Sequence, residues 1–286
     1  MTSTVPIVRT ARELRRHVAL WRGDGLRTAL VPTMGALHAG HLSLIDVARA
    51  RADRVAVSIF VNPKQFAPSE DLATYPRDPA GDLARLAGVG TDLAYMPSAG
   101  EIYPEGFATS VAVSGLTDCL CGVSRPHFFG GVATVVAKLL IQAGADVAVF
   151  GEKDYQQLLV IRRMARDLDI PTEIVGAPTV READGLAMSS RNAYLTPGER
   201  ATAGTFARVL RETADAVGAG GDPDAALARA HQVLASAGAD RIDYIDIRHA
   251  ETLAPASDDP AAPRRIFAAI VIGKTRLIDN LAVPMP

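Results

Sequence analysis

The feature that most constrains the fold is an alternation of short apolar runs with segments of helical periodicity over the first 180 residues. The apolar, β-branched runs are Thr28–Thr33, Arg54–Val61, Asp92–Met96, Asp146–Phe150 and Thr172–Val175. The segments with helical periodicity are His41–Ala50, Pro79–Leu86, Val132–Ala143 and Asp154–Leu168. Strands this apolar must be buried on both faces, so the pattern predicts an α/β fold with a parallel sheet between helices. Ligands bind such sheets at the carboxyl ends of the strands.

The pattern changes after about residue 180. A long helix is predicted to begin at Thr196, where Thr196-Pro-Gly-Glu199 combines an N-cap, an early proline and a capping-box glutamate. A second helix is predicted from Asp222 to about Ala237. Three strand candidates then close the chain: Ile242–Ile247, Ile266–Ile272 and Arg276–Leu281. We therefore expect a Rossmann-like domain over residues 1–180 and a smaller α+β domain over residues 181–286.

Composition excludes several classes of protein. Lys and Arg total 30 against 32 Asp and Glu, a net charge of −2, which argues against a nucleic-acid-binding protein. The longest apolar stretch, Val132–Phe150, is interrupted by Lys138 and Asp146, so no membrane span is expected. Charged residues between positions 10 and 17 argue against a signal peptide. Only two cysteines occur, Cys119 and Cys121, too few for a disulfide framework and predicted to be small buried side chains. A cytoplasmic location is expected.

The most informative motif is Pro32-Thr-Met-Gly-Ala-Leu-His-Ala-Gly-His41, between the first strand and the following helix. The three-residue spacing of His38 and His41 places both imidazoles on one face of a helix N-terminus, where unpaired N–H groups favour a phosphate. Gly35 and Gly40 leave room for a nucleotide near the backbone. A zinc site is the alternative, but no third ligand is nearby.

Three further motifs are predicted to lie near the same sheet edge or at the domain junction. Asn62 and Gln65 follow the second strand and offer neutral groups to a hydroxyl or carboxylate substrate. Phe150-Gly-Glu-Lys-Asp-Tyr-Gln-Gln157 follows another strand, and its Lys153 supplies a charge for phosphate oxygens. Met188-Ser-Ser-Arg-Asn192 offers hydroxyls and a guanidinium that can grip phosphate. The alternatives are an ordinary turn for the first motif, a solvent-exposed pair of Lys153 and Asp154 for the second, and a plain linker for the third.

Together these motifs resemble a known family. The His-Ala-Gly-His core is similar to the signature of the HxGH nucleotidyltransferase superfamily. With Phe60–Phe66, Tyr75-Pro-Arg77, residues 180–192 and Thr275-Arg-Leu-Ile-Asp-Asn280, it closely resembles the pantothenate synthetase (pantoate–β-alanine ligase) family along nearly the whole chain. The resemblance implies ATP-dependent condensation of pantoate with β-alanine through a pantoyl adenylate, giving pantothenate, AMP and pyrophosphate. It also implies a homodimer whose C-terminal domain acts as a lid.

Roles for individual residues follow from the same resemblance. His38, His41, Lys153, Ser189, Ser190 and Arg191 are expected to stabilise the phosphates during catalysis. Gln65, Gln157 and Asn62 are expected to bind pantoate or β-alanine. The ATP site is expected to comprise Met34, Gly35, Ala36, Leu37, His38, Ala39, Gly40, His41, Gly151, Glu152, Lys153, Asp154, Val180, Met188, Ser189, Ser190 and Arg191. Mg²⁺ is expected to bridge phosphate oxygens with few protein ligands.

The chain departs from the family pattern in two places. Phe128 stands where the family usually has a histidine, with His127 one position earlier. Gly81 precedes Asp82, which leaves Asp82 as the candidate carboxylate for a metal ion in that stretch.

Two other functions remain open from the sequence. One is a cytidylyl- or adenylyltransferase of the same superfamily, which would leave the nucleotide on its product. The other is a catalytically silent nucleotide-binding regulator.

Overall fold

The computed structural model describes residues 4–68, 70–256 and 261–285. The chain forms two compact units. The first comprises Met1–Thr117, Arg125–Glu152 and Gln157–Pro178. The second comprises Thr179–Pro286 together with two short segments, Asp118–Ser124 and Lys153–Gln156. The sequence did not indicate that these two segments group with the C-terminal residues.

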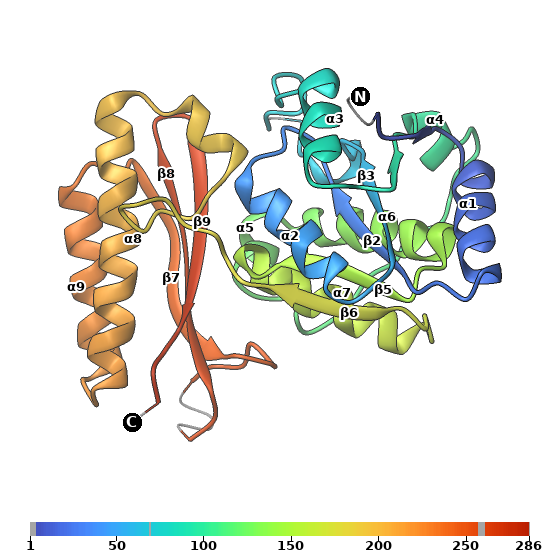
Figure 1. Cartoon of the computed structure of the whole chain (residues 1–286). Helices are drawn as coiled ribbons and strands as arrows, with labels where there is room; N and C mark the ends of the chain where they lie inside the picture. Colours follow the sequence, from blue (N-terminus) through green and yellow to red (C-terminus); the bar gives the residue numbers. More distant parts are fainter. Residues whose placement is uncertain (1–3, 69, 257–260, 286) are drawn as a thin grey trace. The chain divides into compact units, whose positions relative to one another are not determined.

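The first unit is built on a six-stranded sheet in which all neighbouring strands are parallel (Figure 1). In spatial order the strands are β1 (Ile7–Val8), β4 (Leu93–Tyr95), β3 (Arg54–Ile59), β2 (Thr28–Thr33), β5 (Val147–Gly151) and β6 (Glu173–Ala177). The chain proceeds outward from β2 through β3 to β4 on one side, where β1 forms the edge, and from β5 to β6 on the other. The strand order therefore reverses between β2 and β5, and the carboxyl ends of these two strands flank the position where such sheets bind ligands.

Helices cover both faces of this sheet. On one face, α2 (Ala39–Arg49) and α3 (Pro79–Gly88) contribute Leu44, Ile45 and Leu86 to a core formed with alternate residues of the strands. On the other face, α1 (Ala11–Gly23) and α6 (Phe128–Ala143) pack on β2 and on each other. Each fully buried leucine or isoleucine contributes about 1.5–3 kcal/mol relative to an exposed one. The predicted α/β class with a Rossmann-like parallel sheet is confirmed.

Three further helical elements among the described residues belong wholly or mostly to the first unit. They are α4 (Ala99–Ile102), the 3₁₀ helix η1 (Pro63–Gln65) and most of α7 (Tyr155–Asp167). The 3₁₀ helix η2 (Glu152–Asp154) carries the chain from the first unit into the second.

The second unit contains an antiparallel sheet of three strands in the order β7 (Arg241–His249), β8 (Arg264–Ile272) and β9 (Thr275–Ala282). Two helices, α8 (Pro197–Gly218) and α9 (Pro223–Ser236), pack with it around Phe206, Leu234 and Ile270. The unit also holds α5 (Cys121–Ser124) and the 3₁₀ helix η3 (Ser190–Tyr194). Thr196 and Glu199 form the predicted capping box at the start of α8.

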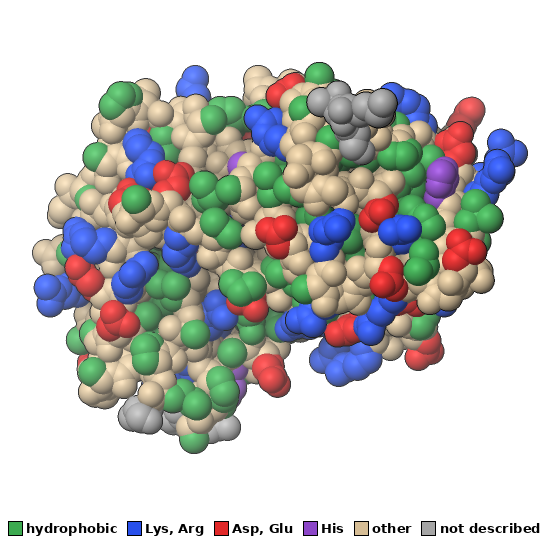
Figure 2. Space-filling model, viewed as in Figure 1, with side chains coloured by type: hydrophobic (Ala, Val, Ile, Leu, Met, Phe, Trp, Pro, Cys, Tyr) green, Lys and Arg blue, Asp and Glu red, His purple; other side chains and the backbone are tan. Residues whose placement is uncertain are grey.

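Basic and acidic side chains are interspersed over the face drawn in Figure 2, as expected for a chain with a net charge of −2. Across residues 4–68, 70–256 and 261–285, no helix is long and apolar enough to cross a bilayer.

Candidate active site

The loop between β2 and α2 places two histidines at the start of a helix. His38 is the N-cap of α2, and its Nδ1 accepts a hydrogen bond from the Gly40 N–H at 3.2 Å. His41 Nδ1 accepts one from the His38 N–H at 3.3 Å. The centroids of the two rings lie 4.1 Å apart. Both imidazoles are thus fixed at the N-terminus of α2, where the three-residue spacing predicts them.

These bonds decide which ring nitrogen carries the proton. A neutral imidazole has one donor nitrogen and one acceptor nitrogen, and the acceptor is Nδ1 in both His38 and His41. The proton of each neutral ring is therefore on Nε2. Two Nε2–H donors stand beside the first turn of α2, whose dipole favours a bound anion.

A buried carboxylate from α3 holds the loop that leads into His38. Asp82 is 1% exposed, and its oxygens accept hydrogen bonds from the N–H of Ala36 at 3.0 Å and of Leu37 at 2.7 Å. Gly35 and Ala36 have φ angles of 82° and 49°, in the left-handed region. This conformation costs a non-glycine residue about 1–2 kcal/mol. Two charge-assisted hydrogen bonds stabilise the turn where that strain lies.

Close packing explains why the loop needs glycine at position 35. A Cβ there would lie 2.9 Å from Asp82 Oδ2 and 3.1 Å from Ile59 Cγ2. Asp82, the candidate metal ligand of the sequence, lies against this loop. Its oxygens face backbone N–H groups, and Arg85 Nη1 lies 3.9 Å from Oδ1. Beside the metal-ligand role predicted from the sequence, this geometry supports a role for Asp82 in positioning the histidine loop.

The Asp82→Asn variant tests this role. An amide turns one N–H group toward the Ala36 and Leu37 donors, which leaves a donor unpaired and displaces the loop. We expect the histidine-dependent step to slow about 10- to 10²-fold, measured as exchange of pyrophosphate into ATP in the presence of pantoate. Asp78→Asn is the matched control, because Asp78 caps the same helix and asparagine caps as well as aspartate. Equal rates for the two variants would contradict the assignment.

Asn62 and Gln65, which follow β3, are held together by side-chain hydrogen bonds. Asn62 is 1% exposed and its Nδ2 donates to Gln65 Oε1 at 3.0 Å and to the Gly131 carbonyl at 3.1 Å. The Tyr103 hydroxyl donates to Asn62 Oδ1 at 2.7 Å. Burial raises the pKa of Tyr103 to about 12, against the opposing effect of this hydrogen bond, so the phenol stays a donor at neutral pH.

This arrangement gives the two amides different tasks. Because Oε1 of Gln65 accepts from Asn62, its Nε2 is turned toward the histidine loop, where it lies 3.1 Å from Met34 Sδ. Gln65 therefore presents a donor beside the loop, and Asn62 sets its orientation. Neither Tyr103 nor the backbone contact of Gly131 could be found from the sequence motifs, because both come from distant segments.

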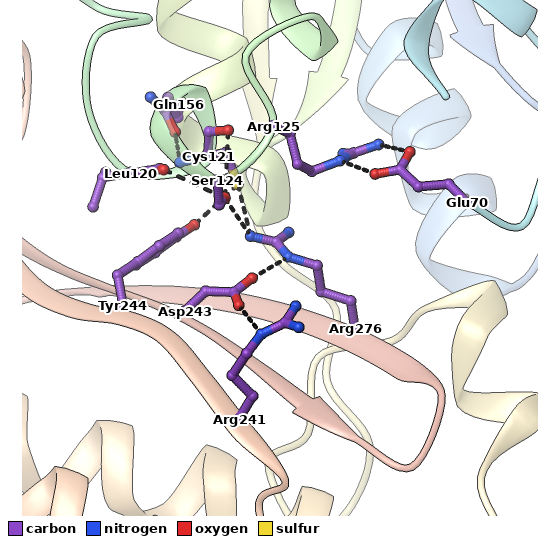
Figure 3. A network of polar contacts seen from close by, with 10 residues as sticks. All are labelled: Glu70, Leu120, Cys121, Ser124, Arg125, Gln156, Arg241, Asp243, Tyr244 and Arg276. Carbon is purple, nitrogen blue, oxygen red and sulfur yellow. Dashed lines mark hydrogen bonds and ion pairs between the residues drawn. The ribbon is translucent and has the colours of Figure 1, made fainter. Parts of the chain in front are cut away.

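Arg125 supports the same region from the start of α6 (Figure 3). Its guanidinium pairs with both Glu70 oxygens at 2.6 Å and donates to the Gln65 carbonyl at 3.0 Å. It also lies 3.9 Å from the centroid of the Phe128 ring. Phe128, which departs from the family pattern, thus stacks on an arginine that holds Gln65. The neighbouring His127 is exposed and makes no side-chain cap for α6.

The Glu70–Arg125 pair predicts a pH dependence of stability. Burial alone would raise the pKa of Glu70, but the hydrogen bond and charge of Arg125 outweigh it and hold the pKa below its ordinary value of 4.5. The stabilisation is therefore present above pH 4.5 and is lost as the pH falls through the lowered pKa. We expect Glu70→Gln to cost about 2 kcal/mol at pH 7, with the difference from wild type shrinking below pH 4.5.

Urea-induced unfolding at several pH values measures this difference. Glu212→Gln is the control, since the Glu212–Arg208 pair is exposed and such pairs contribute at most about 1 kcal/mol. A Glu70→Gln penalty that is the same at pH 3 and pH 7 would contradict the prediction.

The motif at the carboxyl end of β5, residues 150–157, is divided between the two units. Gly151 and Glu152 belong to the first unit, beside the strand-order reversal. Lys153 and Asp154 belong to the second unit, and Gln157 returns to the first, half-buried on α7.

Residues 180–192 form a narrow hairpin in the second unit. The Met188 N–H donates to the Val180 carbonyl at 3.0 Å, and Ser189 Oγ accepts from the Arg191 N–H at 3.3 Å. The Ser189 hydroxyl therefore caps η3, which carries Ser190 and Arg191. The motif that the sequence also allowed as a plain linker is a structured turn.

An ionic cluster anchors this hairpin. Arg200 pairs with Glu182 at 2.6 Å and with Asp184 at 2.5 Å, and Asn192 Nδ2 donates to Glu182 Oε1 at 2.8 Å. The hydrogen bond from Arg200 lowers the pKa of Asp184, so this carboxylate stays charged at neutral pH. The backbone on both sides of Ser189–Arg191 is thus tied to α8.

No sequence motif indicates the polar cluster that surrounds Cys121 (Figure 3). Gln156 Oε1 accepts from the Cys121 N–H at 3.1 Å, and Cys121 Sγ lies 3.0 Å from the Tyr244 hydroxyl. Arg276 donates to Cys121 Sγ at 3.5 Å and pairs with Asp243 at 2.7 Å. Cys121 is buried as predicted, but its neighbours are polar. The contacts hold α5 against β7 and β9, and Gln156 accepts from the α5 backbone.

A parallel sheet, a strand-order reversal and a capped histidine pair at that reversal define an α/β nucleotide-binding enzyme. Comparisons with known proteins identify its family. The family model for pantoate-beta-alanine ligase matches residues 6–282. The chain therefore belongs to the pantoate–β-alanine ligase family, and the ligase activity implied by its motifs is confirmed.

Individual relatives agree along the whole chain. A pantothenate synthetase of Caulobacter vibrioides is 56% identical over 99% of this chain and 100% of its own length. The crystal structure of pantothenate synthetase from Thermus thermophilus matches with a TM-score of 0.90, at 48% identity, covering 98% of this chain and 100% of that one. A pantoate-beta-alanine ligase from Francisella tularensis, solved with beta-gamma ATP and beta-alanine, matches with a TM-score of 0.82 at 35% identity and 97% coverage of both chains.

Proposed function

We propose that the enzyme condenses pantoate with β-alanine in two steps at the carboxyl ends of β2 and β5. The pantoate carboxylate attacks the α-phosphate of ATP and releases pyrophosphate. The β-alanine amine then attacks the carbonyl carbon of pantoyl adenylate and releases AMP. The observation that carries the proposal is the pair of imidazoles of His38 and His41 at the start of α2, whose Nδ1 atoms accept backbone hydrogen bonds and leave Nε2 to carry the proton.

The histidines act on the phosphate that changes charge. Because pantoate supplies the nucleophile, catalysis depends on positioning and on stabilising the charge that develops on the α-phosphate. Both Nε2–H groups are suited to donate to its oxygens, with His41 as the proton donor to the departing pyrophosphate. Reciprocal capping fixes both rings before substrate binds, so little reorganisation is needed.

The amides are assigned to pantoate and β-alanine. Gln65 offers Nε2 as a donor, which suits a carboxylate or hydroxyl oxygen, and Gln157 is assigned to the other side of pantoate. The Francisella relative was solved with beta-alanine, the amine that we assign to the second step. Asn62 orients Gln65, which refines the direct binding role expected from the sequence.

The second unit is assigned to the triphosphate. Lys153 and Arg191 would supply positive charge, and Ser189 and Ser190 hydroxyl or backbone donors, to the oxygens of the departing pyrophosphate. Residues 34–41, Gly151–Asp154, Val180 and Met188 would line the nucleotide.

Mg²⁺ fits this site as an ion held mainly by the substrate. The described residues contain no group of three or more His, Cys, Asp or Glu side chains arranged to hold a metal ion. Phosphate oxygens and water are the ligands that Mg²⁺ usually keeps in nucleotide sites, where it neutralises the triphosphate. Lys153 would also help to neutralise the triphosphate.

We also propose that the enzyme is a homodimer located in the cytoplasm. Light scattering, which measures molar mass, tests the dimer.

Exchange of labelled pyrophosphate into ATP tests the first step. We expect exchange only when pantoate is present, and AMP release only when β-alanine is added. A stable nucleotidyl product would favour a cytidylyl- or adenylyltransferase. ATP binding without exchange would favour a catalytically silent regulator. Either result would overturn the proposal.

A further inference from the structure

Lys153 follows a strand of the parallel sheet, but the antiparallel sheet of the second unit holds its backbone. Asn280 on β9 is 3% exposed, and its Nδ2 donates to the Lys153 carbonyl at 2.9 Å. Its Oδ1 accepts a hydrogen bond from Arg265 Nη1 on β8. An amide whose oxygen is bound to a guanidinium must turn its nitrogen the other way. Arg265 therefore fixes Asn280 in the orientation that donates to Lys153.

A second contact holds the same segment two residues further on. The Arg265 guanidinium lies 3.9 Å from the centroid of the Tyr155 ring. The Tyr155 ring packs on Phe267, with centroids 6.1 Å apart. Arg265 thus contacts Tyr155 directly and Lys153 through Asn280.

The neighbouring residue on β9 links this anchor to the hairpin that carries Ser189–Arg191. Asp279, whose side chain is 1% exposed, accepts from Arg181 at 2.7 and 3.0 Å, and Arg181 also donates to the Asn280 carbonyl at 3.3 Å. η3 packs against β9 as well. The same strand therefore orders both groups that we assign to the triphosphate.

We propose that Asn280 is a positioning residue for Lys153, with Arg265 setting the direction of its amide. The inference rests on the proposed role of Lys153 at the triphosphate. The described residues give the Lys153 ammonium no ion-pair partner. The hydrogen bond from Asn280 therefore fixes the backbone position from which the Lys153 side chain extends. Small displacements of a group at a reacting centre lower the rate by large factors.

Asn280→Asp separates this role from packing. Aspartate has nearly the same shape and keeps an acceptor for Arg265, but it cannot donate to the Lys153 carbonyl. We expect pantoate-dependent pyrophosphate exchange to fall about 10- to 10²-fold. Aminolysis of pre-formed pantoyl adenylate should be unchanged, because the triphosphate plays no part in it. A merely structural role would affect both steps.

Two further measurements make the test specific. In a Lys153→Met background, Asn280→Asp should cause no additional loss of exchange, since groups that act through one another are not additive. Hydrogen–deuterium exchange of the peptide spanning residues 151–157 should be faster in Asn280→Asp. Arg208→Gln on α8 is the control, because the Arg208 side chain makes an exposed pair with Glu212 of the same helix.

Wild-type exchange in Asn280→Asp would overturn the inference, as would a full additional loss in the Lys153→Met background. Failure of the proposed function looks different: the wild-type enzyme itself would show no pantoate-dependent exchange. In that case deuterium exchange at residues 151–157 still decides whether Asn280 anchors the segment.

Discussion

Replacing His41 with asparagine is expected to lower pantoate-dependent exchange of pyrophosphate into ATP by about 10²- to 10³-fold, the usual cost of removing one preorganised donor to a developing charge. Asparagine is chosen because its Oδ1 occupies nearly the position of Nδ1. It can still accept the His38 N–H bond that closes the cap of α2. What it lacks is the Nε2–H donor, so the variant removes the chemistry and keeps the local fold.

His41→Ala is the companion variant. It removes both the donor and the cap, so it should match the catalytic loss and add about 1 kcal/mol of destabilisation in urea unfolding. If asparagine restored most of the rate lost with alanine, the cap rather than Nε2–H would be the important feature. An unchanged single-turnover rate of adenylate formation in either variant would reject the assignment of His41 to the α-phosphate.

Much of the fold could be predicted because its signals are local. The run Thr28–Thr33 is a strand with the predicted bounds, and Thr196 begins α8 through the capping box read in the sequence. The first helix could have been found in the same way, since Thr10 and Glu13 form a capping box at the start of α1. β1 has only two residues, too few for a periodic signal.

The candidate site likewise contains residues that the sequence predicts and residues that it does not. Motifs whose spacing can be read along the chain contain the histidine pair, Gln65, Lys153 and Ser189–Arg191. The residues that position these groups lie outside the motifs. Asp82 reaches the histidine loop from 45 residues away, and Asn280 reaches Lys153 from 127 residues away. Such partners meet only after the sheets have formed, so no local pattern marks them.

Asp82 and Cys121 illustrate this. Asp82 was a metal candidate because its stretch resembles that of the family, and only the structure shows that its oxygens face the N–H groups of a left-handed turn. Cys121 was expected to be a small buried side chain because no histidine or charged cluster accompanies it in the sequence; it is buried, and Arg276 donates to its sulfur. In both cases the deciding neighbour lies on another element.

Replacing Lys153 with methionine is expected to slow pantoate-dependent exchange by about 10²- to 10³-fold, because it removes a positive charge from the oxygens of the departing pyrophosphate. Methionine keeps the length and apolar stem of lysine, and the Asn280 bond to the residue 153 carbonyl remains possible, since it involves only the backbone. The loss should appear in the rate of adenylate formation at saturating ATP more than in ATP binding, because negative charge on the leaving group grows in the transition state.

The second half-reaction separates this effect from general damage. Pyrophosphate has left before β-alanine attacks, so aminolysis of pre-formed pantoyl adenylate should proceed at the wild-type rate in Lys153→Met. Lys274→Met is the control, because Lys274 is exposed in the turn between β8 and β9 and should leave both steps unchanged. If Lys153→Met slowed aminolysis as much as exchange, the lysine would act on the adenylate itself, and the assignment of the second unit to the triphosphate would fail with it.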